Sequence, residues 1–252
     1  YSLGCYGLFS INYFKMISAY ISQISGIKDE CKFWKTEVFN FEKDLYGFYI
    51  TNHPVIKHKL SIIRDKDTPH YVFNQLVNEV GKLMAYEATK DLETKKVNVE
   101  TPLQIAECEK LLDNVIIVPI LRAGLGMADG VCEILPHAKV GHLGLYRDEE
   151  TLETKEYLNK LPSTIKNSVV LLVDPMLATG NTVVYASTLL KKAGVKKIIY
   201  IGLVGVDYGI ENVQKHHPDV DIYLAAKDEK LNDKGYILPG LGDCGDRLFG
   251  TK

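Results

Sequence analysis

The segment VVLLVDPMLATGNT, residues 169–182, joins an apolar run to an amphipathic pattern through a short loop. Its five valines and leucines, 169–173, predict a strand buried on both faces, as strands of parallel sheets are. Asp174 follows this strand, and Thr-Gly-Asn-Thr at 179–182 opens a helix. Backbone N–H groups and the dipole at a helix N-terminus attract phosphate. We therefore expect an α/β sheet with a phosphate site and an acid at the carboxyl end of this strand.

The acid beside the phosphate site indicates what kind of ligand it takes. A carboxylate accepts hydrogen bonds from hydroxyl groups, so Asp174 next to a phosphate suits a ribose 5-phosphate. The alternative is that Asp174 only caps the following helix. Residues 169–182 alone leave both interpretations open.

Apolar periodicity continues the alternation of strands and helices along the chain. Strands are expected at 96–100, 115–120, 138–146, 198–206 and 220–225, and helices at 53–63, 68–92, 124–135, 182–193 and 209–216. Residues 147–157 are polar and acidic, which is typical of a mobile loop. The alternation predicts a doubly wound, mainly parallel sheet.

Composition limits the classes of partner. The chain has 252 residues, 46% of them hydrophobic, and a formal net charge of −2, so neither nucleic acid nor an anionic membrane is expected as a partner. Its five cysteines are widely spaced, which favours a reducing cytosol and a cytoplasmic location. Residues 1–45 are rich in aromatic side chains and contain no arginine. We treat 1–45 as an extension of unknown role and 46–252 as the functional domain.

Two further strand ends carry arginines. Residues 118–126, VPILRAGLG, place Arg122 between a strand and two glycines that let the backbone approach a ligand closely. Arg147 follows the strand at 138–146. A guanidinium fork suits phosphate or pyrophosphate. The alternative for each arginine is an ordinary surface ion pair.

The glycine-rich stretch GYILPGLGDCGDR, residues 235–247, predicts a tightly turned loop without strand or helix. Such a loop exposes backbone N–H and C=O groups, which can pair with the edge of a planar base. An ordinary C-terminal coil is the alternative.

From about Tyr46 to Lys252 the chain resembles the uracil phosphoribosyltransferases. The matching segments are HPVIKHKL (53–60), YEATKDLET (86–94), VPILRAGLGM (118–127), YRDEETL (146–152), DPMLATG (174–180) and GYILPGLGDCGDRLFGTK (235–252). The resemblance implies transfer of the phosphoribosyl group of 5-phosphoribosyl 1-pyrophosphate (PRPP) to uracil, giving UMP and pyrophosphate. It also implies a type I phosphoribosyltransferase fold with a hood over the base site.

The resemblance also implies roles for individual residues. The segment expected around the ribose and its 5-phosphate comprises Asp174, Pro175, Met176, Leu177, Ala178, Thr179, Gly180, Asn181 and Thr182. Arg122 and Arg147 would contact the pyrophosphate, with Arg147 closing over it, and these two with Asp174 would be the catalytic residues. The peptide between Leu121 and Arg122, or one beside it, is expected to be cis.

In the hood, the resemblance implies that Ile237, Gly242 and Cys244 read uracil through their backbones. Asp243, in the same loop, would face the PRPP. No residue is an evident general base for uracil N1. The family often has Gly-Gly-Ser at 180–182 and Ala-Pro-x-Gly at 206–209, where this chain has Gly-Asn-Thr and Val-Asp-Tyr-Gly.

Cofactor and assembly follow from the same resemblance. Pro175 stands where many phosphoribosyltransferases have a second acid, so Mg²⁺ is expected to arrive with PRPP and to be held weakly by protein, with no protein metal site. A homodimer or higher homo-oligomer is expected. Two other functions compete with this interpretation: an RNA-binding regulator, which needs a basic surface, and a catalytically silent relative, which would have lost motif residues.

Overall fold

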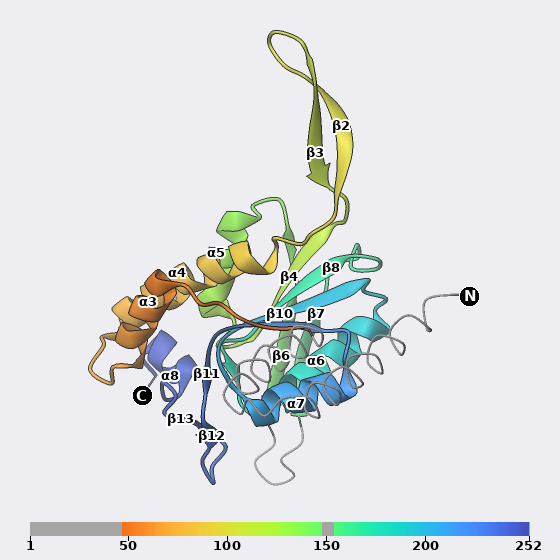
Figure 1. The fold of residues 1–252 in the computed structure, drawn as a ribbon. Helices are drawn as coiled ribbons and strands as arrows, with labels where there is room; N and C mark the ends of the chain where they lie inside the picture. The colour runs from red at the N-terminus through yellow and green to blue at the C-terminus, as the bar shows by residue number, and fades with distance from the viewer. Residues whose placement is uncertain (1–46, 148–153, 252) are drawn as a thin grey trace, which may run out of the picture. The chain divides into compact units, whose positions relative to one another are not determined.

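The computed structural model describes residues 47–147 and 154–251, which are built around one mixed β-sheet (Figure 1). Its strands are β1 (Phe48–Ile50), β4 (Val115–Leu121), β5 (Lys139–Val140), β6 (His142–Arg147), β7 (Thr154–Lys160), β8 (Val169–Val173), β9 (Met176–Leu177), β10 (Lys197–Val206) and β11 (Asp221–Asp228). The strand order is β1-β11-β10-β8-β4-β6-β7, with β5 beside β4 and β9 beside β10.

Six helices of the described residues surround this sheet. They are α3 (Pro54–Arg64), α4 (His70–Ala88), α5 (Leu125–Ile134), α6 (Asn181–Lys192), α7 (Asp207–His216) and α8 (Cys244–Phe249). Two small hairpins complete the fold: β2 (Thr94–Glu100) with β3 (Ile105–Leu111), and β12 (Lys230–Leu231) with β13 (Ile237–Leu238).

The strands from β1 to β6 pair in parallel, and β7 pairs antiparallel to β6. The carboxyl ends of the parallel strands therefore meet at one edge of the sheet, where α/β proteins bind ligands.

Alternation along the central strands creates two cores, one on each face of the sheet. Leu171 of β8 packs in a core with α3, α4, α5 and α8, whereas its neighbour Leu172 packs in a core with α6 and α7. Figure 1 shows α4 and α5 on one side of the sheet and α6 and α7 on the other. Helices on both faces explain why β8 reads as an unbroken apolar run, and the doubly wound, mainly parallel α/β fold is confirmed.

Most expected elements are present, and β8 has the expected bounds. Three expectations were wrong in part. The strand expected at 138–146 is divided into β5 and β6 at Gly141, and the loop expected at 147–157 already contains β7 from Thr154. The C-terminal stretch contains the short strand β13 and the helix α8, because Asp243 caps a helix that begins at Cys244.

Residues 94–111 form a hairpin that the sequence only half revealed, since β3 was not expected. Its strands pair with each other and not with the main sheet, and Figure 1 shows them extending away from it. Near the turn, Leu103 is 95% exposed and Ile105 is 69% exposed. No helix within residues 47–147 and 154–251 has both the length and the apolarity to cross a membrane.

Candidate functional site

Four strands deliver charged residues to the carboxyl edge of the sheet. Arg122 follows β4, Asp174 follows β8, Arg147 ends β6 and Asp228 ends β11. Because these strands are parallel, the residues lie at the same edge. The side chain of Arg147 and residues 148–153 lie outside what the structure describes, so the expected closure of Arg147 over a ligand stays a prediction.

The loop after β8 is held against β10 and α7. Its strand β9 pairs with Val204 and Gly205 of β10. Gly180 has φ +78°, and a Cβ there would lie 2.6 Å from the carbonyl oxygen of Gly209. The chain therefore needs glycine at position 180, both for its left-handed backbone and for this close approach to α7.

Helix α6 begins directly after this glycine, at Asn181. Within the described residues, no side chain caps its N-terminus. The first N–H groups of a helix have no intrahelical partner, and with the helix dipole they form a binding site for an anion. The geometry at 180–182 therefore supports the phosphate site that the sequence predicts.

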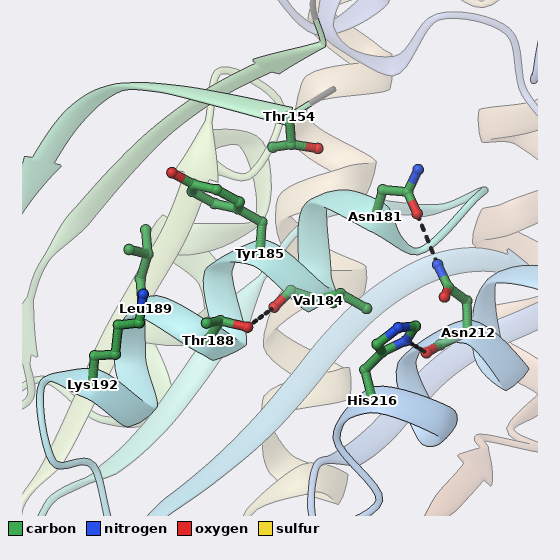
Figure 2. A pocket seen from close by; sticks show the side chains of 9 residues that line it. All are labelled: Thr154, Asn181, Val184, Tyr185, Thr188, Leu189, Lys192, Asn212 and His216. Carbon is green, nitrogen blue, oxygen red and sulfur yellow. Dashed lines mark hydrogen bonds between the residues drawn. The ribbon is translucent and has the colours of Figure 1, made fainter. Parts of the chain in front are cut away.

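Asn181 is a departure from the family pattern, and the structure gives it a partner. The Asn212 amide, on α7, donates a hydrogen bond of 2.8 Å to the Asn181 side-chain oxygen (Figure 2). It donates a second, also of 2.8 Å, to the Thr179 carbonyl. One side chain thus fixes both the loop and the first residue of α6. Sequence reasoning missed Asn212, because nothing in its surroundings singles out this asparagine on an exposed helix face.

Asp174 lies in a largely desolvated position below this loop. Burial raises the pKa of Asp174 to about 7, although a hydrogen bond from the backbone of Met176 opposes the shift. The carbonyl oxygen of Asp174 accepts a 2.6 Å hydrogen bond from the hydroxyl of Tyr200, which is fully buried. The backbone of Asp174 is therefore fixed by this buried hydroxyl, while its carboxyl changes charge near neutral pH. The alternative role as a cap of α6 is not what the structure shows, because Gly180 occupies the cap position.

The loop after β4 packs between β8 and α8. The peptide between Leu121 and Arg122 is cis, which confirms the expectation. A Cβ on Gly124 would lie 2.4 Å from the Val173 carbonyl oxygen, and one on Gly126 would lie 2.5 Å from a methyl carbon of Leu248. The two glycines therefore permit close packing, which brings Arg122 next to the C-terminal helix.

The Arg122 guanidinium is accessible to solvent and forms an ion pair with a carboxylate of α8. Its Nη2 lies 3.4 Å from Oδ1 of Asp246, and its side chain is 57% exposed. The hydroxyl of Thr251 donates a 2.6 Å hydrogen bond to the same Asp246 oxygen. An ion pair this long and exposed is weak. Arg122 thus makes the ion pair that the alternative interpretation expects, yet it remains able to bind a phosphate group.

The C-terminal loop places Cys244 close to Asp174. The thiol is buried, and burial together with the negative charge of Asp174 raises the pKa of Cys244 far above its ordinary value. Gly242 has φ +83°, and Ile237 is 4% exposed. The carboxylate of Asp243 accepts a 2.9 Å hydrogen bond from the N–H of Asp246. Cys244 of the C-terminal loop and the acid at the end of β8 are therefore close enough for the charge of Asp174 to act on the thiol.

A groove of about 540 Å³ lies along α6 and α7 (Figure 2). It is lined by Thr154, Asn181, Val184, Tyr185, Thr188, Leu189, Lys192, Asn212 and His216. Of residues 174–182 only Asn181 lines this groove, so we do not assign it to the substrates. Among the described residues no cluster of three or more His, Cys, Asp or Glu side chains can hold a metal ion.

Two carboxylates at this edge escaped the sequence analysis. Asp228 ends β11 as Asp174 ends β8, so the same rule of an acid at a strand end applies to both. Asp246 carries no such signal, because its proximity to Arg122 depends on how α8 folds back.

A family model described as uracil phosphoribosyltransferase matches residues 50–251. The chain is 56% identical over 203 residues to a uracil phosphoribosyltransferase of Acholeplasma laidlawii, covering 81% of this chain and 98% of that protein. It is 59% identical over 201 residues to one of Clostridium perfringens, covering 79% and 96%.

The fold also matches a solved structure. A protein of Aquifex aeolicus superposes with a TM-score of 0.78 at 38% identity, covering 81% of this chain and 99% of that one. The agreement covers nearly the whole of that structure.

Proposed function

The chain belongs to the uracil phosphoribosyltransferase family, and from that premise we propose which residues bind uracil and PRPP and how they act. The reaction transfers the phosphoribosyl group of PRPP to uracil and gives UMP and pyrophosphate, a step of pyrimidine salvage. The uncapped N-terminus of α6 after Gly180, beside Asp174, is the single observation that carries the proposal.

The 5-phosphate of PRPP binds residues 178–182. The N–H groups at the start of α6 point at the anion, and the hydroxyls of Thr179 and Thr182 supply further donors. Asn212 keeps this loop in place through its two hydrogen bonds. The remaining loop residues, Pro175, Met176 and Leu177, connect this cradle to Asp174.

The ribose hydroxyls bind the Asp174 carboxylate. Breaking the bond between C1 and pyrophosphate builds positive charge on the ribose, which a nearby carboxylate stabilises. Because burial raises the pKa of Asp174 to about 7, this stabilisation needs a proton to leave the carboxyl near neutral pH.

The leaving pyrophosphate binds Arg122 and Arg147. Negative charge grows on it as the bond breaks, and guanidinium groups stabilise that charge through paired hydrogen bonds. The exposed guanidinium of Arg122 supports this role.

Uracil binds the backbone of Ile237, Gly242 and Cys244, with Asp243 toward the PRPP. The proximity of Cys244 to Asp174 supports this placement, since base and ribose must meet there. A neutral donor–acceptor edge suits backbone groups, which carry no charge.

Magnesium is proposed to enter with PRPP. Asp174 and Asp243 would offer carboxylate oxygens near the site, and the substrate phosphates would supply further oxygen ligands of the kind that Mg²⁺ prefers. When bound, the ion neutralises charge on the pyrophosphate.

We also propose a homodimer or higher homo-oligomer. A two-stranded hairpin alone is marginally stable in water. Within the described part of the chain, the β2–β3 hairpin pairs with no other strand and has the exposed apolar side chains Leu103 and Ile105 near its turn. Light scattering after size exclusion tests this. The double substitution Leu103→Lys and Ile105→Lys should lower the molar mass of the particle in solution. A monomeric mass for the wild-type protein would refute the proposal.

The domain limits and the location are proposals of the same kind. We propose that residues 46–252 form the catalytic domain and 1–45 an extension whose role is open. The described cysteines Cys108, Cys132 and Cys244 are free thiols, which supports a reducing, cytoplasmic environment. Cell fractionation tests the location.

The decisive experiment on function is uracil-dependent release of pyrophosphate from PRPP. The full chain should release pyrophosphate only with both substrates, and UMP should appear in equal amount. Absence of UMP from folded protein would refute the assignment of substrates.

A further inference from the structure

One Arg–Asp pair holds both polar backbone groups of Gly240, in the C-terminal loop. Arg64, the last residue of α3, binds Asp228, the last residue of β11, with Nη2–Oδ1 at 2.6 Å and Nη1–Oδ2 at 2.8 Å. Nη1 of Arg64 also donates to the Gly240 carbonyl at 2.7 Å. Oδ2 of Asp228 accepts the Gly240 N–H at 2.8 Å. Gly240 and Asp228, which are 12 residues apart, are therefore both joined to Arg64, more than 160 residues earlier in the chain.

Because Asp228 is buried, its carboxylate depends on these hydrogen bonds. The side chain of Asp228 is 5% exposed and that of Arg64 is 25% exposed. A buried carboxylate that loses a partner is strongly destabilised, so the pair and the loop hold each other in place. Gly240 has φ +62°, and a Cβ there would lie 2.1 Å from the carbonyl oxygen of Ile237. This position therefore cannot carry a side chain that would anchor the loop in another way.

A second arginine ties the far end of the loop to the same end of α3. Nη1 of Arg247 donates to the carbonyl oxygens of Leu241 and Ile63, each at 2.7 Å, and Nη2 donates to the carbonyl of Asp65. Its guanidinium lies 4.3 Å from the centre of the Phe73 ring. Hydrogen bonds therefore fix the chain on both sides of residue 242, at residues 240–241 and at Arg247.

We propose that Arg64 and Asp228 are positioning residues for uracil: they set the backbone of residues 240–242 to match the edge of the base. This inference rests on the proposed base-reading role of that loop. Both side chains act through Gly240 and neither touches the reacting atoms. Asp228, although it lies at the same sheet edge as Asp174, is already engaged on both oxygens by Arg64 and the loop.

The test is a kinetic comparison of Asp228→Asn and Arg64→Lys in the full chain. Asn keeps the shape but can accept on only one atom, and Lys is a point charge that cannot bridge a carboxylate and a carbonyl as a planar fork does. Each change should raise the KM for uracil about tenfold or more, as loss of a charge-assisted hydrogen bond does. The KM for PRPP and kcat should change by less than about threefold.

The matched control is Asp221→Asn, at the opposite end of the same strand. Asp221 binds Lys197 at 2.8 Å and lies far from the carboxyl edge. All three kinetic constants should stay within about twofold of wild type. The double variant of Arg64 and Asp228 should be no worse than either single one, since both break one unit. Thermal unfolding monitors the folded fraction, and if Asp228→Asn does not fold, Arg64→Lys decides.

Two results overturn the inference: an unchanged KM for uracil in both folded variants, or a collapse of kcat with both KM values unchanged, which would make Asp228 a catalytic residue. Gly242→Ala separates failure of this inference from failure of the base-reading assignment. If Gly242→Ala raises the KM for uracil and the Arg64 and Asp228 variants do not, only the positioning role of Arg64 and Asp228 is refuted. If it too leaves uracil unaffected, the loop does not read the base.

Discussion

Replacing Asp174 with Asn should stabilise the protein and disable the reaction. Burial raises the pKa of Asp174 from 3.8 to about 7, so above pH 7 the folded protein holds a charge in a desolvated position. At about 1.4 kcal/mol per pKa unit, this shift lowers the free energy of unfolding by about 4 kcal/mol when the carboxyl is charged. Because the residue keeps part of its surface accessible, this value is an upper limit.

The sign of the pH dependence follows from linkage. Between pH 4 and 7 the unfolded chain has lost the proton of Asp174 and the folded protein still holds it, so wild-type stability falls as the pH rises through this range. Above pH 7 the loss is complete, and below pH 4 it is absent. The amide introduced by Asp174→Asn carries no charge at any pH, so the variant should gain stability over wild type from pH 4 upward, reaching a plateau near pH 7.

Urea unfolding at pH 4, 6 and 8 measures this gain, and uracil-dependent pyrophosphate release measures turnover. Turnover should fall about 100- to 1,000-fold, as when an electrostatic partner of the transition state is removed, and the wild-type kcat/KM should decline below about pH 7 as Asp174 takes up its proton. Asp207→Asn is the control, because Asp207 follows β10 as Asp174 follows β8 but is exposed and paired with Lys227. Two results would refute the reasoning. One is wild-type turnover in folded Asp174→Asn. The other is a stability difference between variant and wild type that is the same at pH 4 and pH 8.

Four further predictions concern other parts of the site. Asn212→Leu should raise the KM for PRPP about tenfold in steady-state kinetics, because it removes both hydrogen bonds that hold the phosphate loop; an unchanged KM would contradict this. Cys244 should resist alkylation by iodoacetamide at pH 8 in the folded protein, since burial raises its pKa and excludes reagent; rapid labelling mapped to Cys244 by mass spectrometry would argue against its buried position. Deletion of residues 1–40 should leave kcat/KM largely intact, and an inactive but soluble truncation would show that the extension contributes to the site. Uracil should be used in preference to orotate and cytosine in competition assays, because a carboxylate beside Asp243 and an unpaired backbone donor are both costly, the latter by about 1–3 kcal/mol; comparable kcat/KM for orotate would overturn the base-reading assignment.

The sheet could be predicted because burial on two faces leaves a clear mark on sequence. β8 and β10 are nearly unbroken apolar runs, and the helix α4 buries Phe73, Leu76, Val80 and Met84 at helical spacing. Strand β3 was not predicted, because most of its residues are exposed and charged side chains interrupt its alternation. The short elements β13 and α8 were hidden by glycines that suggest coil.

The candidate site was predictable where chemistry lies at a strand end. Asp174 and Arg122 follow buried strands, so topology alone brings them to one edge. Arg64 and Asn212 could not be found in this way, because each acts across a separation that only the folded chain closes, and neither residue type is unusual on a helix.

The contact between α8 and α3 has a consequence for synthesis of the chain. Arg247 and Ile63 are 184 residues apart in sequence, so the ribosome completes every strand of the main sheet before the partner that ties the loop to α3 exists. A nascent chain arrested before residue 235 can form β4, β8, β10 and β11, yet it leaves bare the apolar surface that Leu248 later covers. We expect such a chain to bind no uracil in equilibrium dialysis and to recruit holdase chaperones until α8 emerges. Uracil binding by the arrested chain would show that the pocket matures earlier. On this view the proposed base site forms only after α8 has been synthesised, so a chain arrested before residue 235 does not sequester uracil.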